Sequence, residues 1–157
     1  MRILNSAEAA SFADSLRRAG KRVVFTNGVF DLLHPGHVRY LTAARAQGDA
    51  LIVAVNSDRS VRANKGPDRP LTPQDERAEI LAGLECVDAV VIFDEETPDA
   101  IVKTIQPDVL VKGADWAENA IVGRDTVEAR GGRVVRIPIE PGWSTTEIVE
   151  RIRQTRT

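Results

Sequence analysis

Residues 25–39 read Phe-Thr-Asn-Gly-Val-Phe-Asp-Leu-Leu-His-Pro-Gly-His-Val-Arg, an apolar strand that runs into a helix. Proline is pre-set for the first position of a helix, so Pro35 predicts His34 as the N-cap and His37 as the third helical residue. Residues three apart share a helix face, which places both imidazoles beside the unpaired N–H groups at the helix N-terminus. The stretch predicts an anion site with two histidines, where Gly36 lets a phosphate approach the backbone. An ordinary capped helix is the alternative.

The bulk properties predict one soluble domain over residues 1–157. The chain is 43% hydrophobic and 28% charged, has no apolar run long enough for a membrane span, and begins without a signal-peptide pattern. A single cysteine, Cys86, cannot form an internal disulfide, so the expected location is the cytoplasm. The formal charge of -2 argues against a nucleic-acid binder.

Strand and helix patterns alternate along the chain, which predicts an α/β fold with a parallel five-stranded sheet and helices on both faces. Such a sheet binds ligands at the carboxyl ends of its strands, where Thr26, Asn56 and Lys112 fall. Residues 56–73 are polar and contain several prolines, and are expected to form an active-site lid loop. The expected strands are 22–26, 51–55, 87–93, 109–112 and 134–137. The expected helices are 6–19 (within an N-terminal segment 1–20, with Ser6 as N-cap), 34–47, 73–84, 97–105 (capped by Thr97), 124–130 and 144–153.

Cations crowd the expected lid: Arg59, Arg62, Lys65 and Arg69 face only two aspartates. This pattern favours a small anionic substrate, although a solvated basic loop has the same composition. Walker A, Gly-x-Gly-x-x-Gly, paired-cysteine and Gly-x-Ser-x-Gly patterns are absent, so kinase, dehydrogenase and serine hydrolase functions have no support.

Four motifs together resemble the nucleotidyltransferase superfamily, in its cytidylyltransferase-like branch. They are Gly-x-Phe-Asp at 28–31, His-x-Gly-His at 34–37, Lys-Gly-Ala-Asp-Trp at 112–116 and Gly-Trp-Ser-Thr-Thr-Glu-Ile at 142–148. The resemblance covers residues 22–153 and implies a Rossmann-like sheet. Within the branch the chain is most similar to the adenylyltransferases of ADP-heptose synthesis, which join ATP and heptose 1-phosphate and release pyrophosphate for lipopolysaccharide core assembly.

The resemblance also assigns roles by position. His34 and His37 hold the triphosphate, and Lys65 pairs with the α-phosphate. The nucleotide-binding residues are expected to be Thr26, Asn27, Gly28, Val29, Phe30, Gly36, Lys112, Gly113, Asp115, Ser144, Thr145 and Thr146. Candidates near the acceptor are Asp31, Asn56, Asp58, Arg59 and Arg69.

Several assignments stay open at this stage. Asp31 is either an acceptor ligand or a structural side chain that holds a loop through backbone N–H groups. Arg77 either reaches phosphate or forms a surface ion pair. Trp116 and Trp143 each either flank the base or cover the sheet edge.

A triphosphate substrate implies Mg²⁺, held mainly by phosphates and water because no carboxylate cluster offers a protein cage. The expected partners are ATP and a sugar phosphate, with no nucleic acid and no membrane, in a homo-oligomer such as a dimer. The alternative is a cytidylyltransferase for a phosphorylated alcohol such as glycerol 3-phosphate. Those relatives often carry an arginine where this chain has Pro138-Ile-Glu-Pro141, which weakens that alternative. A nucleotide-sensing module would be expected to lose a histidine or the lid lysine, and this chain has both.

Overall fold

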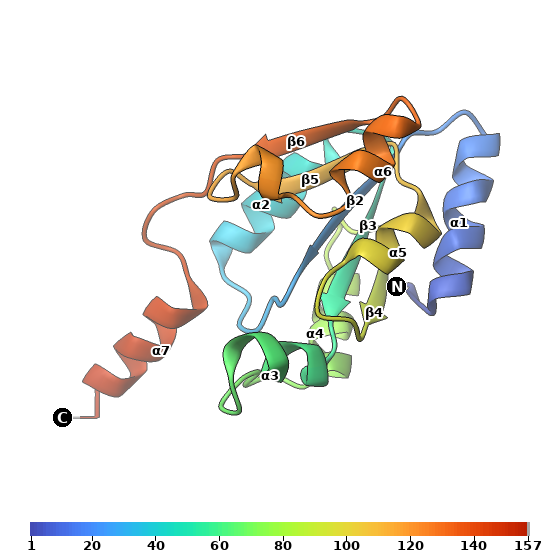
Figure 1. Cartoon of the computed structure of the whole chain (residues 1–157). Coiled ribbons are helices and arrows are strands. Elements are labelled where there is room, and N and C mark those ends of the chain that lie inside the picture. Colours follow the sequence, from blue (N-terminus) through green and yellow to red (C-terminus); the bar gives the residue numbers. More distant parts are fainter. Residues whose placement is uncertain (157) are drawn as a thin grey trace.

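A computed structural model describes residues 1–156 as one six-stranded parallel sheet with helices on both faces (Figure 1). The expected five strands are present, and the structure adds a sixth at the edge, where Ile3–Leu4 pairs with Val90 and Val91. Two residues are too few for any sequence pattern to show a strand. The strands are β1 (Ile3–Leu4), β2 (Val23–Gly28), β3 (Ala50–Asn56), β4 (Ala89–Phe93), β5 (Val109–Gly113) and β6 (Arg133–Ile137).

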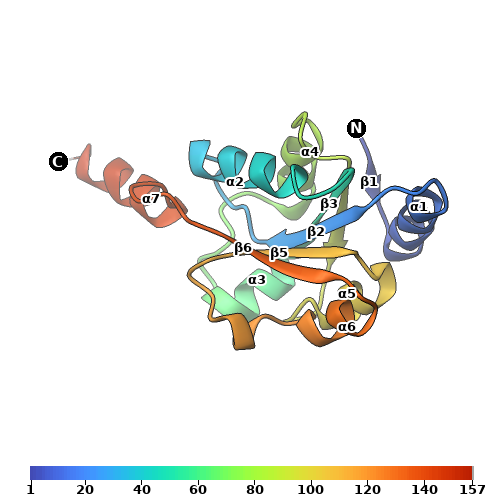
Figure 2. The same cartoon turned by 90° about the horizontal axis from the view of Figure 1, so that it is seen from above.

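The helices form two layers around the sheet. In Figure 2, α2 and α4 lie above the sheet and α5 and α6 lie below it. Two apolar cores follow this division: one joins α2 and α4 to the sheet, and the other joins α1, α5 and α6 to the opposite face. The helices are α1 (Ser6–Arg18), α2 (Pro35–Arg45), α3 (Asp58–Lys65), α4 (Gln74–Ala82), α5 (Asp99–Ile105), the 3-10 turn η1 (Glu118–Ala120), α6 (Arg124–Ala129) and α7 (Thr145–Gln154).

Three local predictions are corrected. Asn5, rather than Ser6, caps α1, since its side chain accepts from the Glu8 amide and Glu8 accepts from the Asn5 amide. The expected loop 56–73 contains α3. Pro98, rather than Thr97, stands at the N-cap of α5, without a side-chain cap bond.

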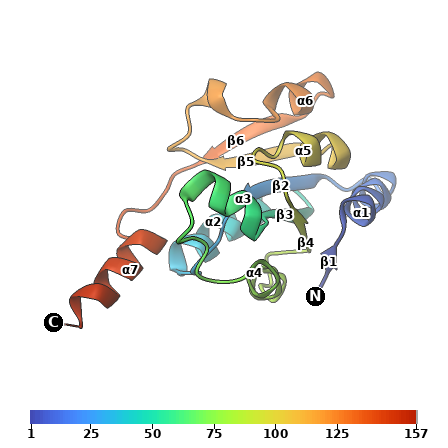
Figure 3. The same ribbon diagram turned by 60° about the horizontal axis from the view of Figure 1, so that its bottom comes forward.

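The strand order places the site. The sheet runs β1-β4-β3-β2-β5-β6, so the chain builds outward from β2 through β3 and β4 before it returns to β2's other side as β5. A crevice opens at the carboxyl ends of two strands where the order reverses in this way. The His-x-Gly-His motif at the start of α2, after β2, and the Lys-Gly-x-Asp motif at the end of β5 meet at that crevice. Figure 3 shows α7 extending away from the sheet beyond this end.

Candidate active site

The N-terminus of α2 holds the two histidines as the sequence predicts. His34 is the N-cap, and its Nδ1 accepts a hydrogen bond from the His37 amide at 3.3 Å. The two imidazoles stack with centroids 3.8 Å apart. Because His34 Nδ1 is an acceptor, neutral His34 carries its proton on Nε2, where it is free to donate.

Glycine is required at position 36 for a reason that the sequence alone does not show. A Cβ there would lie 2.9 Å from both His34 Nδ1 and the Trp143 Cβ. The absence of a side chain therefore lets the His34 ring pack against the helix start, with the Trp143 ring stacked at 6.3 Å on it.

Both histidines are held neutral. Burial, together with a smaller effect of the neighbouring His34, lowers the pKa of His37 to about 4. Burial also lowers the pKa of His34, against an opposing effect of Glu147. His37 Nδ1 is buried and has no hydrogen-bond partner within residues 1–156. The Phe30 ring contacts His37 edge-on at 5.3 Å and contributes to this dry environment. At neutral pH each ring is thus an uncharged donor.

A cavity of about 850 Å³ lies over the carboxyl ends of the strands and contains these histidines. It gathers most of the expected site residues into one space. Those that line it are Asn27, Gly28, Val29, Phe30, His34, Gly36, His37, Asn56, Lys65, Lys112, Gly113, Asp115 and Ser144.

The cavity is also lined by residues outside the set expected to bind nucleotide or substrate. One face of α2 contributes side chains that lie three, four and seven residues after Gly36. The loop after β4 contributes others. That loop follows a strand's carboxyl end, so the topology itself was the available signal. The further lining residues are Arg39, Tyr40, Ala43, Asn64, Glu96, Thr97, Pro98, Leu110, Trp116, Ile121, Val122, Ile137, Pro138, Ile139, Glu140 and Trp143.

Lys112 reaches the cavity from the end of β5. Its Nζ donates to the Asn27 carbonyl and to Asn27 Oδ1, each at 3.3 Å, and lies 5.0 Å from the Trp116 ring centroid. Burial lowers the pKa of Lys112 to about 8, although Asp115 favours its charged form. The ammonium therefore stays protonated at pH 7 and is poorly solvated, which strengthens its attraction for an anion.

Thr26 lies beneath the cavity and does not line it. Its hydroxyl donates to the Val111 carbonyl at 2.9 Å, so the 2.8 Å contact with the Tyr40 hydroxyl uses the Tyr40 proton. Burial raises the pKa of Tyr40 to about 12. Thr26 thus ties β2 to β5 and α2, and any contact with nucleotide would have to be made by its backbone.

The carboxylate of Asp31 is occupied by hydrogen bonds within the protein. Its carboxylate is 6% exposed as a residue and accepts from the backbone amides of Leu71 and Thr72 at 2.8–3.0 Å and from Arg69 at 3.1 Å. The backbone and Arg69 bonds hold the pKa of Asp31 below its usual range despite the opposing effect of burial. Asp31 thus holds a loop through backbone N–H groups, as in the second of its two expected roles. Neither Asp31 nor Arg69 lines the cavity.

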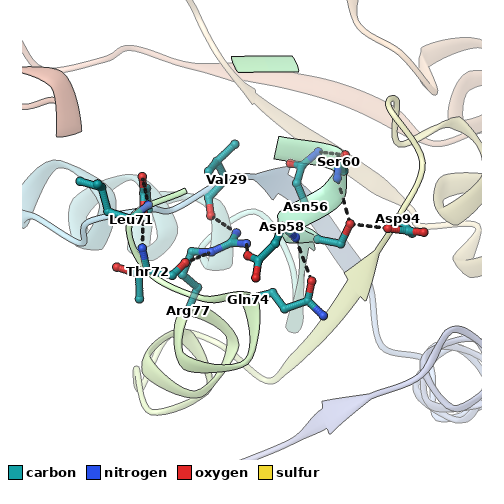
Figure 4. A network of polar contacts seen from close by, with 11 residues as sticks. Val29, Asn56, Asp58, Ser60, Leu71, Thr72, Gln74, Arg77 and Asp94 are labelled. Carbon is teal, nitrogen blue, oxygen red and sulfur yellow. Dashed lines mark hydrogen bonds and ion pairs between the residues drawn. The ribbon is translucent and has the colours of Figure 1, made fainter. Parts of the chain in front are cut away.

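Arg77 is neither a phosphate ligand nor a surface ion pair: it is 1% exposed. Its guanidinium donates to the Val29 and Thr72 carbonyls and to the Asp58 carboxylate (Figure 4). Asp58 is thereby occupied, and Arg59 forms an exposed ion pair with Asp94. Neither Asp58 nor Arg59 lines the cavity.

Helix α3 is fastened to the loop after β4. Ser57, its N-cap, donates to Asp94, while Ser60 and Asn64 donate to the Glu95 and Glu96 carbonyls at 2.7 and 3.2 Å. Asn56 is buried and donates to Ser60 at 3.0 Å. These bonds hold the helix whose last residues, Asn64 and Lys65, line the cavity with the histidines.

The Ser-Thr-Thr stretch begins α7 as predicted, but only one of its three residues lines the cavity. Ser144 lines the cavity and caps the helix, since its hydroxyl accepts from the Glu147 amide at 3.0 Å. Thr145 contacts the Leu32 carbonyl at 3.4 Å. Thr145 and Thr146 are not part of the cavity wall.

Within residues 1–156 no three His, Cys, Asp or Glu side chains are grouped to hold a metal ion. Over the same residues, none of the helices is both long and apolar enough to cross a membrane.

Comparison with known proteins identifies the family to which the chain is related. The model of the cytidylyltransferase-like family matches residues 25–151. The bifunctional protein HldE of Syntrophotalea carbinolica is 57% identical over 87% of this chain, and that of Geotalea uraniireducens is 53% identical over 97%. The matched parts are 28% and 31% of those proteins, so the chain spans under a third of their length.

Two solved structures share the architecture. A lipopolysaccharide core biosynthesis protein from Thermoplasma volcanium superposes with a TM-score of 0.64 at 29% identity, over 77% of this chain and 98% of its own. The pantoate-beta-alanine ligase of Francisella tularensis has a TM-score of 0.63 at 16% identity, over all of this chain and 78% of its own, and supports the fold alone. From the family match, the relatives and the paired histidines at the crevice, the chain belongs to the cytidylyltransferase-like family and is a nucleotidyltransferase.

Proposed function

We propose that the chain is an adenylyltransferase that joins ATP and D-glycero-D-manno-heptose 1-phosphate to give ADP-heptose and pyrophosphate. The observation that carries the transfer chemistry is the stacked pair His34 and His37 in one cavity with Lys112, Lys65 and Ser144. The choice of ATP and a heptose phosphate is supported by the motif resemblance, by HldE relatives of up to 57% identity and by a neighbour named for lipopolysaccharide core biosynthesis.

The proposed reaction is a direct displacement. An oxygen of the acceptor phosphate attacks the α-phosphorus, and the bond from that phosphorus to the α–β bridging oxygen breaks as pyrophosphate leaves. The neutral N–H groups of His34 and His37 donate to the triphosphate oxygens as charge grows on them. Lys112 and Lys65 supply positive charge, and Ser144 contributes a hydroxyl near the end of the phosphate chain.

The mechanism needs no protein nucleophile. Two histidines invite the idea of a nucleotidylated intermediate. Both rings, however, lie beside the N-terminal amides of α2, a position suited to binding oxygens around phosphorus rather than to in-line attack. ATP made chiral by sulfur substitution at the α-phosphorus is therefore expected to give inverted product. Net retention, or labelled enzyme trapped without acceptor, would contradict direct transfer.

We also propose Mg²⁺ as the cofactor. The carboxylates on the cavity wall, Glu96, Asp115 and Glu140, come from separate segments. This arrangement suits an ion that enters with the triphosphate and keeps water ligands, since Mg²⁺ is commonly held by one or two carboxylates plus substrate phosphates. The ion would neutralise charge on the phosphates.

The test offers purified protein ATP, CTP, GTP and UTP, each with heptose 1-phosphate, other sugar 1-phosphates and glycerol 3-phosphate, and follows pyrophosphate release. ATP with heptose 1-phosphate is expected to be turned over best. Preference for CTP with glycerol 3-phosphate would establish the alternative cytidylyltransferase. Nucleotide binding without pyrophosphate release on any pair would indicate a sensing module.

A further inference from the structure

The largest fully buried side chain in the described residues belongs to Arg77, a cation that the catalytic chemistry above does not use. Its Nη1 donates to the Val29 carbonyl at 2.7 Å, its Nε to the Thr72 carbonyl at 2.8 Å and its Nη2 to Asp58 Oδ1 at 2.8 Å. Burying a guanidinium is costly unless every partner is in place. The side chain thus joins three separate segments at one point (Figure 4).

The first of these segments sets the environment of His37. Phe30 follows Val29 and has φ 50, a left-handed conformation that is strained for a non-glycine residue. Its ring lies against the backbone of Gly28, where a Cβ would be 2.9 Å from the Phe30 ring, and meets the His37 ring edge-on at 5.3 Å. The conformation of Phe30 therefore decides what covers His37.

Phe30 is held from both sides. On one side Arg77 fixes the Val29 carbonyl, and on the other Asp31 accepts from the amides of Leu71 and Thr72. Arg77 also binds the Thr72 carbonyl, so the two fastenings converge on the same segment. Removal of Arg77 would release one end of the left-handed residue.

The third partner, Asp58, belongs to the helix that carries Lys65 on the cavity wall. Asp58 is the first residue of α3, and its backbone amide donates a further hydrogen bond to Gln74 Oε1 at 2.8 Å. The same helix ends at Lys65, which lines the cavity with Asn64. A single guanidinium thereby connects the loop that covers His37 to the helix that carries Lys65.

We infer that Arg77 is a positioning residue: it holds Phe30 over His37 and fixes α3, so that the histidine and lysine walls of the cavity keep their spacing. The inference rests on the proposed function only for its effect on turnover. Its effect on His37 is independent of any reaction.

The first experiment reads His37 directly. The chain has only two histidines, so NMR titration of the ring protons is simple, with His34→Gln to assign the signals. In the unaltered protein His37 is expected to titrate near 4. The groups that face it are His34 and the Phe30 ring, with Glu147 acting on His34. In Arg77→Met the ring becomes wetter, and its midpoint is expected to rise by at least one pH unit, with Arg77→Lys between the two.

Arg45→Met is the matched control. Arg45 also pairs with one carboxylate, Asp88 at 2.8 Å, and one carbonyl, Gly48 at 2.9 Å, but at the amino end of β3. It is expected to leave the His37 midpoint and turnover unchanged. Equal His37 midpoints in Arg77→Met and the unaltered protein, with both folded, would overturn the inference.

Turnover provides the second readout. Misplacement by about 1 Å costs roughly 100-fold, so Arg77→Met is expected to lower kcat by that order with a smaller change in KM, and Arg77→Lys to restore part of it. If Arg77→Met does not fold, Asp58→Asn cuts only the bond to α3. Its effect on kcat is expected to shrink severalfold in a Lys65→Ala background, whereas equal effects in both backgrounds would contradict the link to Lys65.

The two hypotheses fail differently. A shifted His37 midpoint in a protein that releases no pyrophosphate with any substrate pair would support the positioning role and refute the adenylyltransferase. An active adenylyltransferase whose His37 midpoint is unshifted in Arg77→Met would support the proposed function and refute the positioning role.

Discussion

Single residues in this cavity differ mainly in how much water reaches them. His37 has lost most of its solvent and is neutral, whereas Lys112 is part-buried and still charged at pH 7. A neutral donor and a poorly solvated cation serve a polyanion in different ways: the first stabilises charge that grows during transfer, and the second provides constant attraction.

The histidines are expected to affect turnover rather than folding. His34→Ala or His37→Ala removes a donor to the triphosphate and should lower kcat by about 100- to 1000-fold, as the loss of an oxyanion-type donor does. His34→Asn keeps an N–H and is expected to lose less. Pyrophosphate release and a thermal melt on each variant provide the check, and near-normal turnover with an unchanged melt would contradict the role.

Lys112 is expected to make nucleotide binding depend on pH. Because its folded pKa is about 8, the cation is present below that pH and is lost as the pH rises through 8. The KM for ATP should therefore rise between pH 7 and 9.5. Lys112→Arg keeps its charge over this range. If the rise persists in Lys112→Arg, another group is responsible.

At the scale of elements, α3 is held by hydrogen bonds more than by apolar packing. Ser57 caps it, and Ser57, Ser60 and Asn64 bind the 94–96 segment, while Val61 is its one fully buried apolar side chain. Whether α3 opens and closes over substrate as a lid stays a prediction. Its attachment at both ends identifies which bonds such a motion would have to break.

The cap of α3 is expected to matter for activity, whereas the cap of α1 is not. Ser57→Ala and Asn5→Ala each remove a side-chain cap and should cost about 1 kcal/mol of unfolding free energy. Ser57→Ala should in addition speed proteolysis within residues 58–65 and lower kcat/KM, because Lys65 is less well placed. Denaturant unfolding, limited proteolysis and kinetics on both variants compare them, and equal kinetic losses would contradict a specific role for α3.

Elements with strong local signals could be predicted from the sequence. Pro35 after His34 and Ser144 before a helical pattern both mark helix starts that the structure confirms. Helix α3 could not be found in this way, because its residues are mostly polar and its partners lie some 35 positions further along the chain. The two-residue β1 carries no periodicity at all.

In the candidate site, too, local motifs could be predicted from the sequence and contacts between distant residues could not. Motif residues at strand ends, such as Lys112 and His37, line one cavity as expected from topology. Asp31, Asp58, Arg59 and Arg69 were expected near the acceptor, but each has an ion-pair partner in the structure. Composition shows that charges are present, and only the tertiary structure shows which charges neutralise one another.

At the scale of the whole molecule, the strand order brings the His-x-Gly-His and Lys-Gly-x-Asp motifs together in one poorly solvated site. The burial of His37 in this site makes the free energy of unfolding fall at acid pH. Unfolded His37 has a pKa near 6.5 and folded His37 near 4, so the unfolded chain binds the extra proton between these values. Stability is fully present above pH 6.5 and is lost as the pH falls toward 4, by up to roughly 3 kcal/mol.

Urea unfolding between pH 7 and 4 measures this loss. His37→Gln cannot titrate and is expected to show a flatter profile over the same range, with carboxylates such as Asp31 contributing only at lower pH. If His37→Gln loses stability as steeply as the unaltered protein, the acid sensitivity lies elsewhere.

The chain contains only two tryptophans, and both line the cavity: Trp143 stacked on His34 and Trp116 beside the Lys112 ammonium. A protonated imidazole and a nearby cation both alter indole emission. The intrinsic fluorescence of this protein therefore originates entirely at the site. Entry of a nucleotide, or a change in either neighbour's charge, can be followed by emission without any label.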